Sequence, residues 1–242
     1  MNLLTIYPIQ SCNLHCYYCP MKQWTYPADD PLNKLNNELI FRWIDKYIDP
    51  SEWMIEISGG EPGMYPEISE LVKVLSSRGF YGEIKTNGTL PIPKTDTFIR
   101  IAAWHESRDL EHPPEYIDEM LILRNPHDCW KEKIQYCKDN NIPYKDVQFR
   151  ECHIENSLRK RKASMDMPRI NKYIDNWCIV YSSGRMTGCP KEGNSEEISL
   201  QNMSPPVTHK IKKGCTQCGQ IGGFEIHIPV EWREKLGIDI VV

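Results

Sequence analysis

Short runs of alternating apolar and polar residues separate stretches with helical spacing through the first two thirds of the chain. Six runs predict strands and four stretches predict helices. The strands are residues 3–9, 53–58, 81–87, 97–104, 120–124 and 146–151, and the helices are residues 37–48, 66–78, 114–119 and 128–140. Strands that alternate with helices indicate an α/β fold with a parallel sheet and right-handed crossovers.

Four of these strands place polar residues at every other position. The polar positions are Glu56, Ser58, Glu83, Lys85, Asn87, Arg124, Gln148 and Arg150, and the apolar positions that alternate with them are Ile55, Ile57, Ile84, Leu121, Leu123, Val147 and Phe149. A parallel sheet covered by helices on both faces is apolar throughout, whereas a curved sheet with helices only outside allows a polar lumen. We therefore expect a barrel or partial barrel around a polar cavity. The alternative is a set of edge strands that face water, and residues 97–104 fit neither face.

The alternation ends near residue 156, and the chain beyond is rich in Gly, Ser, Pro and Cys. This change predicts two units, residues 1–155 and residues 156–242. The net charge of −4 gives no field that would favour nucleic acid, and no apolar stretch or charged signal peptide indicates a membrane or secreted protein. Ten cysteines then suggest metal ligation in a reducing cytoplasm.

Three cysteines, Cys12, Cys16 and Cys19, follow directly after the first predicted strand. Thiolates are the usual ligands of iron–sulfur clusters, and a trio leaves one iron of a four-iron cluster open. Active sites of barrel enzymes lie at this carboxyl end of the strands. The alternatives for the spacing alone are a zinc knuckle or reactive thiols.

Two further motifs lie at the ends of the next two strands. They are Gly59-Gly60-Glu61-Pro62 and Thr86-Asn87-Gly88. Together with the Cys-x3-Cys-x-Tyr-Cys run, in which Tyr18 is the aromatic residue, they resemble the radical S-adenosylmethionine (SAM) superfamily over roughly residues 1–155. The resemblance implies a partial (β/α)6 barrel.

The resemblance also implies a mechanism. A 4Fe–4S cluster on the three cysteines binds SAM, and one electron, supplied by a donor such as flavodoxin or ferredoxin, produces a 5′-deoxyadenosyl radical that abstracts a substrate hydrogen atom. The implied cofactor-binding residues are Tyr18, Gly59, Gly60, Glu61, Pro62, Asn87, Arg124 and Asn125. In this scheme Glu61 holds the methionine ammonium, the glycines allow close approach to a ligand, and Tyr18 lies near the adenine.

A second set of cysteines lies in the C-terminal unit: Cys178, Cys189, Cys215 and Cys218. The stretch from Trp177 to Cys189 resembles the opening of a SPASM or Twitch auxiliary-cluster domain, and the four thiols are enough to close one 4Fe–4S cluster. The cysteines that a second auxiliary cluster would need are absent, so the Twitch form is the better match. The alternative is a zinc site with four cysteine ligands.

Other candidates rest on position alone. His105, Glu106 and Cys152 follow strand ends near the expected mouth and are candidate catalytic residues. The alternative for Cys152, as for Cys129 and Cys137, is a small buried apolar residue.

The function that these patterns favour is radical SAM catalysis on a polar substrate, such as oxidation of a small molecule. The alternative is modification of a peptide or nucleotide, and the remote one is a metal-binding protein without catalysis. The absence of a domain before the barrel argues modestly against a peptide maturase. The sequence predicts no oligomeric state.

Overall fold

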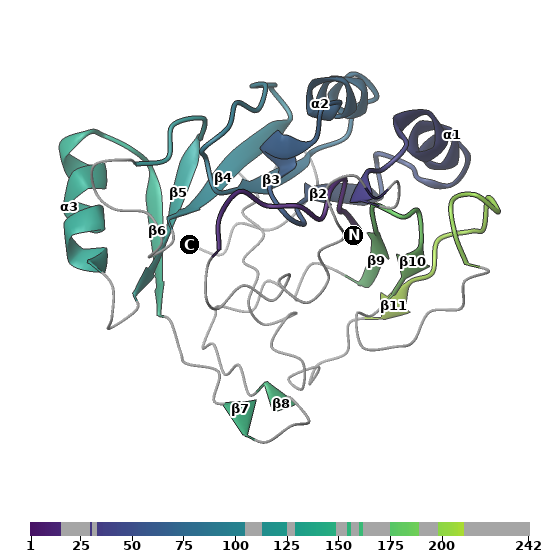
Figure 1. Cartoon of the computed structure of the whole chain (residues 1–242). Coiled ribbons are helices and arrows are strands. Elements are labelled where there is room, and N and C mark those ends of the chain that lie inside the picture. The colour runs from purple at the N-terminus through teal and green to yellow at the C-terminus, as the bar shows by residue number, and fades with distance from the viewer. Residues whose placement is uncertain are drawn as a thin grey trace.

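A parallel sheet organises the chain (Figure 1). The computed structural model describes residues 1–15, 30, 33–104, 113–124, 129–148, 154–155, 160–161, 175–188 and 198–210, some strand residues by backbone alone. Six neighbouring parallel strands follow chain order: β1 (Asn2–Ile6), β2 (Trp53–Ile57), β3 (Gly82–Thr86), β4 (Phe98–Trp104), β5 (Glu119–Arg124) and β6 (Tyr144–Gln148). The predicted α/β class and parallel order are confirmed.

Three helices lie along the outer side of the curved sheet (Figure 1). They are α1 (Asn37–Tyr47), α2 (Ile68–Ser77) and α3 (Trp130–Asp139). Helix α1 begins after Asn36, whose side chain accepts a hydrogen bond from the Leu39 amide at 2.8 Å, the usual chemistry of a helix N-cap. A short 3₁₀ helix, Pro62–Met64, follows β2.

The apolar face of the first strands packs against α1 and α2. Leu4, Ile55 and Ile84 are fully buried in one cluster with Ile40 of α1 and Leu71 of α2. This arrangement confirms the predicted outer face of β2 and β3. The prediction was wrong by one residue at β5, because Met120 and Ile122, and not Leu121, pack with Cys137 of α3. Since strand side chains alternate, Leu121 lies on the opposite face.

The chain beyond the predicted boundary contributes to the same sheet. Strand β9 (Asn176–Val180) pairs in parallel with β1, while β10 (Met186–Thr187) and β11 (His209–Lys210) pair antiparallel with β9. A separate antiparallel pair joins β7 (Ile154–Glu155) to β8 (Lys160–Arg161). The sheet is therefore continuous between the two predicted units, although they are far apart in sequence.

Side-chain hydrogen bonds also attach the C-terminal segment to α1. The indole of Trp43 donates to the Ser204 carbonyl at 2.7 Å, and the Tyr47 hydroxyl donates to the Met203 carbonyl at 2.7 Å. The N-terminal amine pairs with Asp175 at 2.7 Å, just before β9. These contacts attach the residues just before β9 to the start of β1, and residues 203–204 to α1.

The predicted helix at residues 114–119 is wrong. Residues 113–118 are irregular and Glu119 begins β5. The Glu115 amide donates to the Gly88 carbonyl at 3.0 Å and the Asp118 amide donates to the Arg100 carbonyl at 2.8 Å. Hydrogen bonds to neighbouring segments thus hold the backbone of residues 113–118. A helix of six residues is not stable enough to replace them, because its first turn is costly to form.

Three other expectations are met only in part. Residues 87–97, all of which are described, connect β3 to β4 without a helix, so the (β/α) repeat is incomplete there. Strand β1 ends at Ile6, and Ile9 forms an isolated bridge with Lys34 instead of extending the strand. Strand β6 starts two residues before its predicted position, and residues 149–151 lie outside the described part.

None of the helices in the described ranges is long and apolar enough to span a membrane.

Candidate active site

The loops at the carboxyl ends of β1 and β2 are joined by backbone hydrogen bonds. The Gly60 amide donates to the Ile9 carbonyl at 3.0 Å, and the Glu61 amide donates to the Ser11 carbonyl at 2.8 Å. Ser11 immediately precedes Cys12. The Gly-Gly-Glu-Pro motif therefore holds the backbone from which the predicted cluster loop starts.

The two glycines are required by this close approach. A Cβ on Gly60 would lie 2.0 Å from the Ser11 carbonyl oxygen, and a Cβ on Gly59 would lie 2.7 Å from the Ile9 oxygen. Gly59 also has φ of +115°, which side chains rarely adopt. We expected the glycines to allow close approach of a ligand. In this structure they allow close approach of the chain's own backbone at Ile9 and Ser11, just before Cys12.

The carboxylate of Glu61 ties the end of β2 to the end of β3. One oxygen accepts from the Thr86 hydroxyl at 2.6 Å and the Gly63 amide at 2.9 Å, and the other accepts from the Asn87 amide at 2.7 Å. The residue is only 1% exposed. Its partners in the structure are therefore protein donors, whereas the sequence-based expectation gave it the methionine ammonium.

Hydrogen-bond donors surround the sulfur of Cys12. The Leu14 amide lies 3.4 Å from Sγ and the Asn87 side-chain amide nitrogen lies 3.8 Å from it. Donors of this kind suit a thiolate that carries negative charge as a metal ligand. Cys12 is the one member of the predicted trio within the described residues, and its surroundings fit a cluster ligand.

Asn33 is a site residue that the sequence did not reveal. Its side-chain oxygen accepts from the amides of Gln10 and Ser11 at 3.0 and 3.1 Å, and its nitrogen donates to the Ser11 hydroxyl at 2.6 Å. It is fully buried. An isolated Asn ahead of a predicted helix carries no motif, so only the fold shows that it fixes the loop before Cys12.

The inner face of the sheet carries a buried group of charged residues on β2 and β3, just before the strand-end motifs. The Lys85 ammonium lies 2.5 Å from a Glu56 oxygen and 3.1 Å from a Glu83 oxygen. The Thr5 hydroxyl donates to Glu56 at 3.4 Å and accepts from the Trp177 indole at 2.8 Å. These contacts confirm the predicted polar inner face on β2 and β3.

Electrostatics keep this group charged. Burial alone would lower the pKa of Lys85, but Glu56 and Glu83 outweigh that effect and raise it. Burial raises the pKa of Tyr7 as well, and the nearby Glu56 charge adds to the increase. The inner face of the sheet therefore presents the Lys85 ammonium between Glu56 and Glu83, beside the Tyr7 phenol.

Cys178 has a different environment from Cys12. It lies in β9 opposite Leu4, is fully buried, and belongs to the apolar cluster that packs on α1. Burial raises the pKa of its thiol to about 12, although a hydrogen bond involving the Val207 backbone opposes the increase. Cys137 of α3 is likewise buried, against Met120 and Ile122 of β5, and burial raises the pKa of its thiol to about 11. The expectation of an apolar role for Cys137 is confirmed.

Many predicted site residues lie outside the described part of the chain: Cys16, Tyr18, Cys19, His105, Glu106, Asn125, Cys152, Cys189, Cys215 and Cys218. Arg124 is the last residue of β5, described by its backbone, and Pro62 opens the 3₁₀ helix after β2. Among the described side chains, no three of His, Cys, Asp or Glu converge as a metal-binding group.

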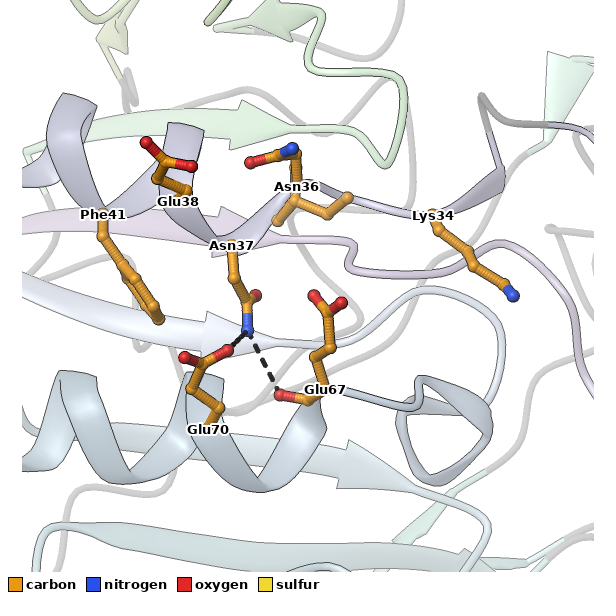
Figure 2. Close-up of a pocket in the computed structure, with 8 residues that line it drawn as sticks. Lys34, Asn36, Asn37, Glu38, Phe41, Glu67 and Glu70 are labelled. Atoms are coloured by element: carbon orange, nitrogen blue, oxygen red, sulfur yellow. Dashed lines mark hydrogen bonds between the residues drawn. The ribbon is translucent and has the colours of Figure 1, made fainter.

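A groove lies outside the sheet, at the N-terminal ends of α1 and α2 (Figure 2). The Asn37 side chain spans it and donates to the Glu70 carboxylate at 2.8 Å and to the Glu67 carbonyl at 3.3 Å. None of the predicted site residues that the structure describes is among those that line the groove. The predicted chemistry is therefore separate from this acidic surface feature.

Comparison with known proteins identifies the class that this fold and site define. The family model described as the Radical SAM superfamily matches residues 6–149. This range runs from the last residue of β1 through β6 and includes all three strand-end motifs. The chain belongs to the radical SAM superfamily and is an enzyme that uses SAM and an iron–sulfur cluster.

Individual relatives differ in the extent of their likeness. A Methanocaldococcus jannaschii protein, provisionally named a glycyl-radical enzyme activating enzyme, is 28% identical over 84% of this chain and 71% of its own length. GTP 3′,8-cyclase 1 of Mycobacterium tuberculosis is 32% identical over 53% of this chain and only 37% of its own length. Streptococcus suis SuiB, bound to precursor peptide SuiA, aligns with 83% of this chain and 64% of its own at 16% identity and a TM-score of 0.45. The last likeness carries no functional argument.

Proposed function

We propose that Cys12, Cys16 and Cys19 hold the 4Fe–4S cluster of this radical SAM enzyme and that its substrate is a polar molecule bound in the lumen of the sheet. The observation that carries the proposal is the joining of three strand-end loops around Cys12 by hydrogen bonds of Gly60, Glu61 and Asn87. When bound, the cluster and SAM supply the 5′-deoxyadenosyl radical that abstracts a substrate hydrogen atom.

The chain's own residues orient this chemistry. Asn33 fixes the backbone before Cys12, and Gly60 lets the β2 loop pack directly on it. Glu61 then holds the β3 turn in place. Such preorganisation is what a reactive cofactor requires of a protein, because it must be positioned and shielded from competing reactions.

The ionic group in the lumen supports a polar substrate. Glu56 and Glu83 are three residues before the strand-end motifs and Lys85 is one residue before, so all three lie farther from the carboxyl ends of the same strands. Oxidation of a small molecule remains our first candidate, with peptide or nucleotide modification as the alternative. A catalytically inactive metal-binding protein is excluded by the family assignment.

A second candidate is activation of a glycyl-radical protein, in which the substrate is a glycine of a partner chain. It is favoured by the identity with the M. jannaschii relative over 84% of this chain. The two candidates differ in the source of the deuterium that reaches 5′-deoxyadenosine. In the first case it comes from a labelled small molecule, and in the second it comes from a partner protein labelled at glycine.

We further propose an auxiliary 4Fe–4S cluster on Cys178, Cys189, Cys215 and Cys218, supported by their spacing. Cys178 is the ligand to test, because a buried thiol with a raised pKa is a poor metal ligand unless the metal displaces its proton. Iron and zinc analysis of anaerobically purified protein distinguishes two clusters from one cluster plus zinc. A Cys178→Ala variant that retains the second metal would remove Cys178 from the ligand set.

The remaining roles are also proposals. Tyr18 lies near the adenine of SAM, Arg124 and Asn125 contact its ribose or its carboxylate, and His105, Glu106 and Cys152 supply acid–base or hydrogen-donor chemistry. Flavodoxin or ferredoxin supplies the electron. The reducing cytoplasm suits both the cysteine content and the oxygen-sensitive cluster.

The central experiment measures 5′-deoxyadenosine. Wild-type protein, reconstituted with iron and sulfide under anaerobic conditions and reduced with dithionite, should cleave SAM. Cys16→Ala should abolish cleavage, while Cys137→Ala should retain it, because Cys137 is a buried core residue in α3. Cleavage by the Cys16 variant would contradict the proposed cluster ligands.

A further inference from the structure

The side chain of Asn87 is directed at the sulfur of Cys12 and not toward an open space. Its amide nitrogen lies 3.8 Å from Cys12 Sγ and 2.8 Å from the Asn13 side-chain oxygen, so the two amide hydrogens have separate acceptors. The residue is only 5% exposed. The sequence placed Asn87 among cofactor contacts, but its donor group is already used within the protein.

Three hydrogen bonds to two neighbouring residues hold this orientation. The Asn87 side-chain oxygen accepts from the Thr89 amide at 3.0 Å and from the Thr89 hydroxyl at 2.5 Å. The Asn87 backbone amide donates to the buried Glu61 carboxylate at 2.7 Å. With its oxygen fixed by Thr89, the amide can present its nitrogen to Cys12 in one orientation only.

A donor at this position has a defined electrostatic effect. One-electron reduction adds negative charge to a cluster and its thiolate ligands, and an N–H group pointing at the sulfur stabilises that charge. Hydrogen bonds to cluster sulfurs are among the factors that set iron–sulfur reduction potentials. The Leu14 amide, 3.4 Å from the same sulfur, acts in the same direction but cannot be altered by side-chain replacement.

We propose that Asn87 is a positioning residue that donates a hydrogen bond to the Cys12 thiolate and thereby raises the reduction potential of the cluster, with Thr89 and Glu61 fixing its orientation. The proposal rests on the proposed function, because it requires Cys12 to be a cluster ligand. It assigns the Asn of the Thr-Asn-Gly turn to the electron-transfer step and not to SAM binding.

The test is a potentiometric titration of the reconstituted full chain without SAM, followed by the electron paramagnetic resonance signal of the reduced cluster. Asn87→Leu removes the amide in a side chain of similar size, and its midpoint potential should shift to a more negative value than that of wild type. Asn13→Leu is the matched control, because Asn13 bonds to Asn87 without a hydrogen bond to Cys12 in the structure. Its midpoint potential should stay at the wild-type value.

A second measurement is independent of potential. In deuterated buffer, electron–nuclear double resonance should detect an exchangeable deuteron near the reduced cluster that is lost in Asn87→Leu and retained in Asn13→Leu. An unchanged potential in Asn87→Leu, or equal shifts in both variants, overturns the proposal. A folded Asn87→Leu protein that fails to take up iron also overturns it, because Asn87 would then assemble the site. A wild-type protein without a cluster contradicts the proposed function and removes this inference with it.

Discussion

At the scale of single residues, the site depends on contacts that the sequence motifs do not identify. Gly60 and Glu61 are recognisable in the sequence, but the backbone of Ser11 and the amide of Asn87, which they contact, are not. The residue types could be predicted because they recur at strand ends. Their partners could not, because those partners come together only when three loops fold side by side.

Gly60→Ala should destabilise the protein strongly. The added Cβ would lie 2.0 Å from the Ser11 oxygen, so the β2 loop and the cluster loop must separate. Overpacking against rigid backbone costs about 3 kcal/mol in the free energy of unfolding, and iron uptake should fall with it. Urea unfolding and iron content per chain measure both effects.

Gly79→Ala is the matched control. Its φ is +84°, but no atom lies within 4 Å of the added Cβ, so only the backbone conformation is penalised. We expect a loss of about 1 kcal/mol and normal iron content. Equal losses of stability in Gly60→Ala and Gly79→Ala would show that the close contact with Ser11 does not add to the destabilisation.

Glu61→Gln should also reduce stability. The amide that replaces one carboxylate oxygen must face a hydrogen-bond donor, either Asn87 N–H or the Thr86 and Gly63 donors. Leaving a buried donor without an acceptor costs about 1–3 kcal/mol in the free energy of unfolding. Glu38→Gln on α1, whose side chain is 82% exposed, should change stability by less than about 0.5 kcal/mol. If Glu61→Gln left the free energy of unfolding unchanged, the carboxylate would not be needed to hold the β3 turn.

At the scale of elements, long periodic segments were predictable and short ones were not. Helices α1 and α2 carry apolar residues at helical spacing that pack on the sheet, so their pattern and their packing agree. The segment before β5 has too few residues to show a period, and Asp118 takes its partners from β4. The pattern of residues 97–104 matched neither an apolar nor a polar face, because Arg100 interrupts the apolar positions. Its charge is paired with Asp118, which the local sequence pattern does not reveal.

The pair of Arg100 and Asp118 predicts a pH dependence of stability. The guanidinium donates to both carboxylate oxygens, at 3.0 and 2.9 Å, and the Arg100 amide adds a third bond at 3.0 Å. Burial raises the pKa of Asp118, but these bonds and the Arg100 charge outweigh it and lower the pKa below its usual value of 3.8. The pair therefore stabilises the fold fully above that value, and its contribution is lost as the pH falls through the lower pKa of the folded state.

Asp118→Asn should therefore cost about 1 kcal/mol at pH 7, a modest value because solvent screens this half-buried pair. The difference in the free energy of unfolding between this variant and wild type should shrink as the pH is lowered from 5 toward 3. Urea unfolding at several pH values measures it. Asp96→Asn, an exposed position between β3 and β4, should show no comparable difference at pH 7. A gap between wild type and Asp118→Asn that widens on acidification would contradict the assignment.

At the scale of the whole molecule, the order of the first six strands followed from their alternation with helices, since parallel neighbours in chain order are the simplest arrangement. The placement of β9 did not. Its run from Asn176 to Val180 was taken as part of a separate unit because Gly, Ser, Pro and Cys dominate the surrounding sequence. Strand pairing between β1 and β9 depends on contacts across about 170 residues, and no local pattern encodes it.

A protein that ends at residue 155 should not fold independently. It would lack β9, and with it the hydrogen-bonded neighbour of β1 as well as the bonds from Trp43 and Tyr47 to the C-terminal segment. We expect aggregation or a poorly dispersed NMR spectrum. In the full chain, Val180→Pro should weaken the same pairing, because the backbone of Val180 faces β1, where its carbonyl accepts from the Tyr7 amide, and proline has no amide to donate on that side. A folded, monomeric fragment of residues 1–155 would contradict this expectation and support the predicted domain boundary.

The pairing of β1 with β9 also sets an order of events during synthesis. The first strand leaves the ribosome early, but its partner on one side is translated about 170 residues later. At about 5–20 residues per second, that edge of β1 remains open for roughly 10–30 seconds, as an unpaired edge that can attract other chains. The loop carrying Cys12 starts from this incompletely supported strand, so stable metal insertion should follow, and not accompany, the completion of the chain.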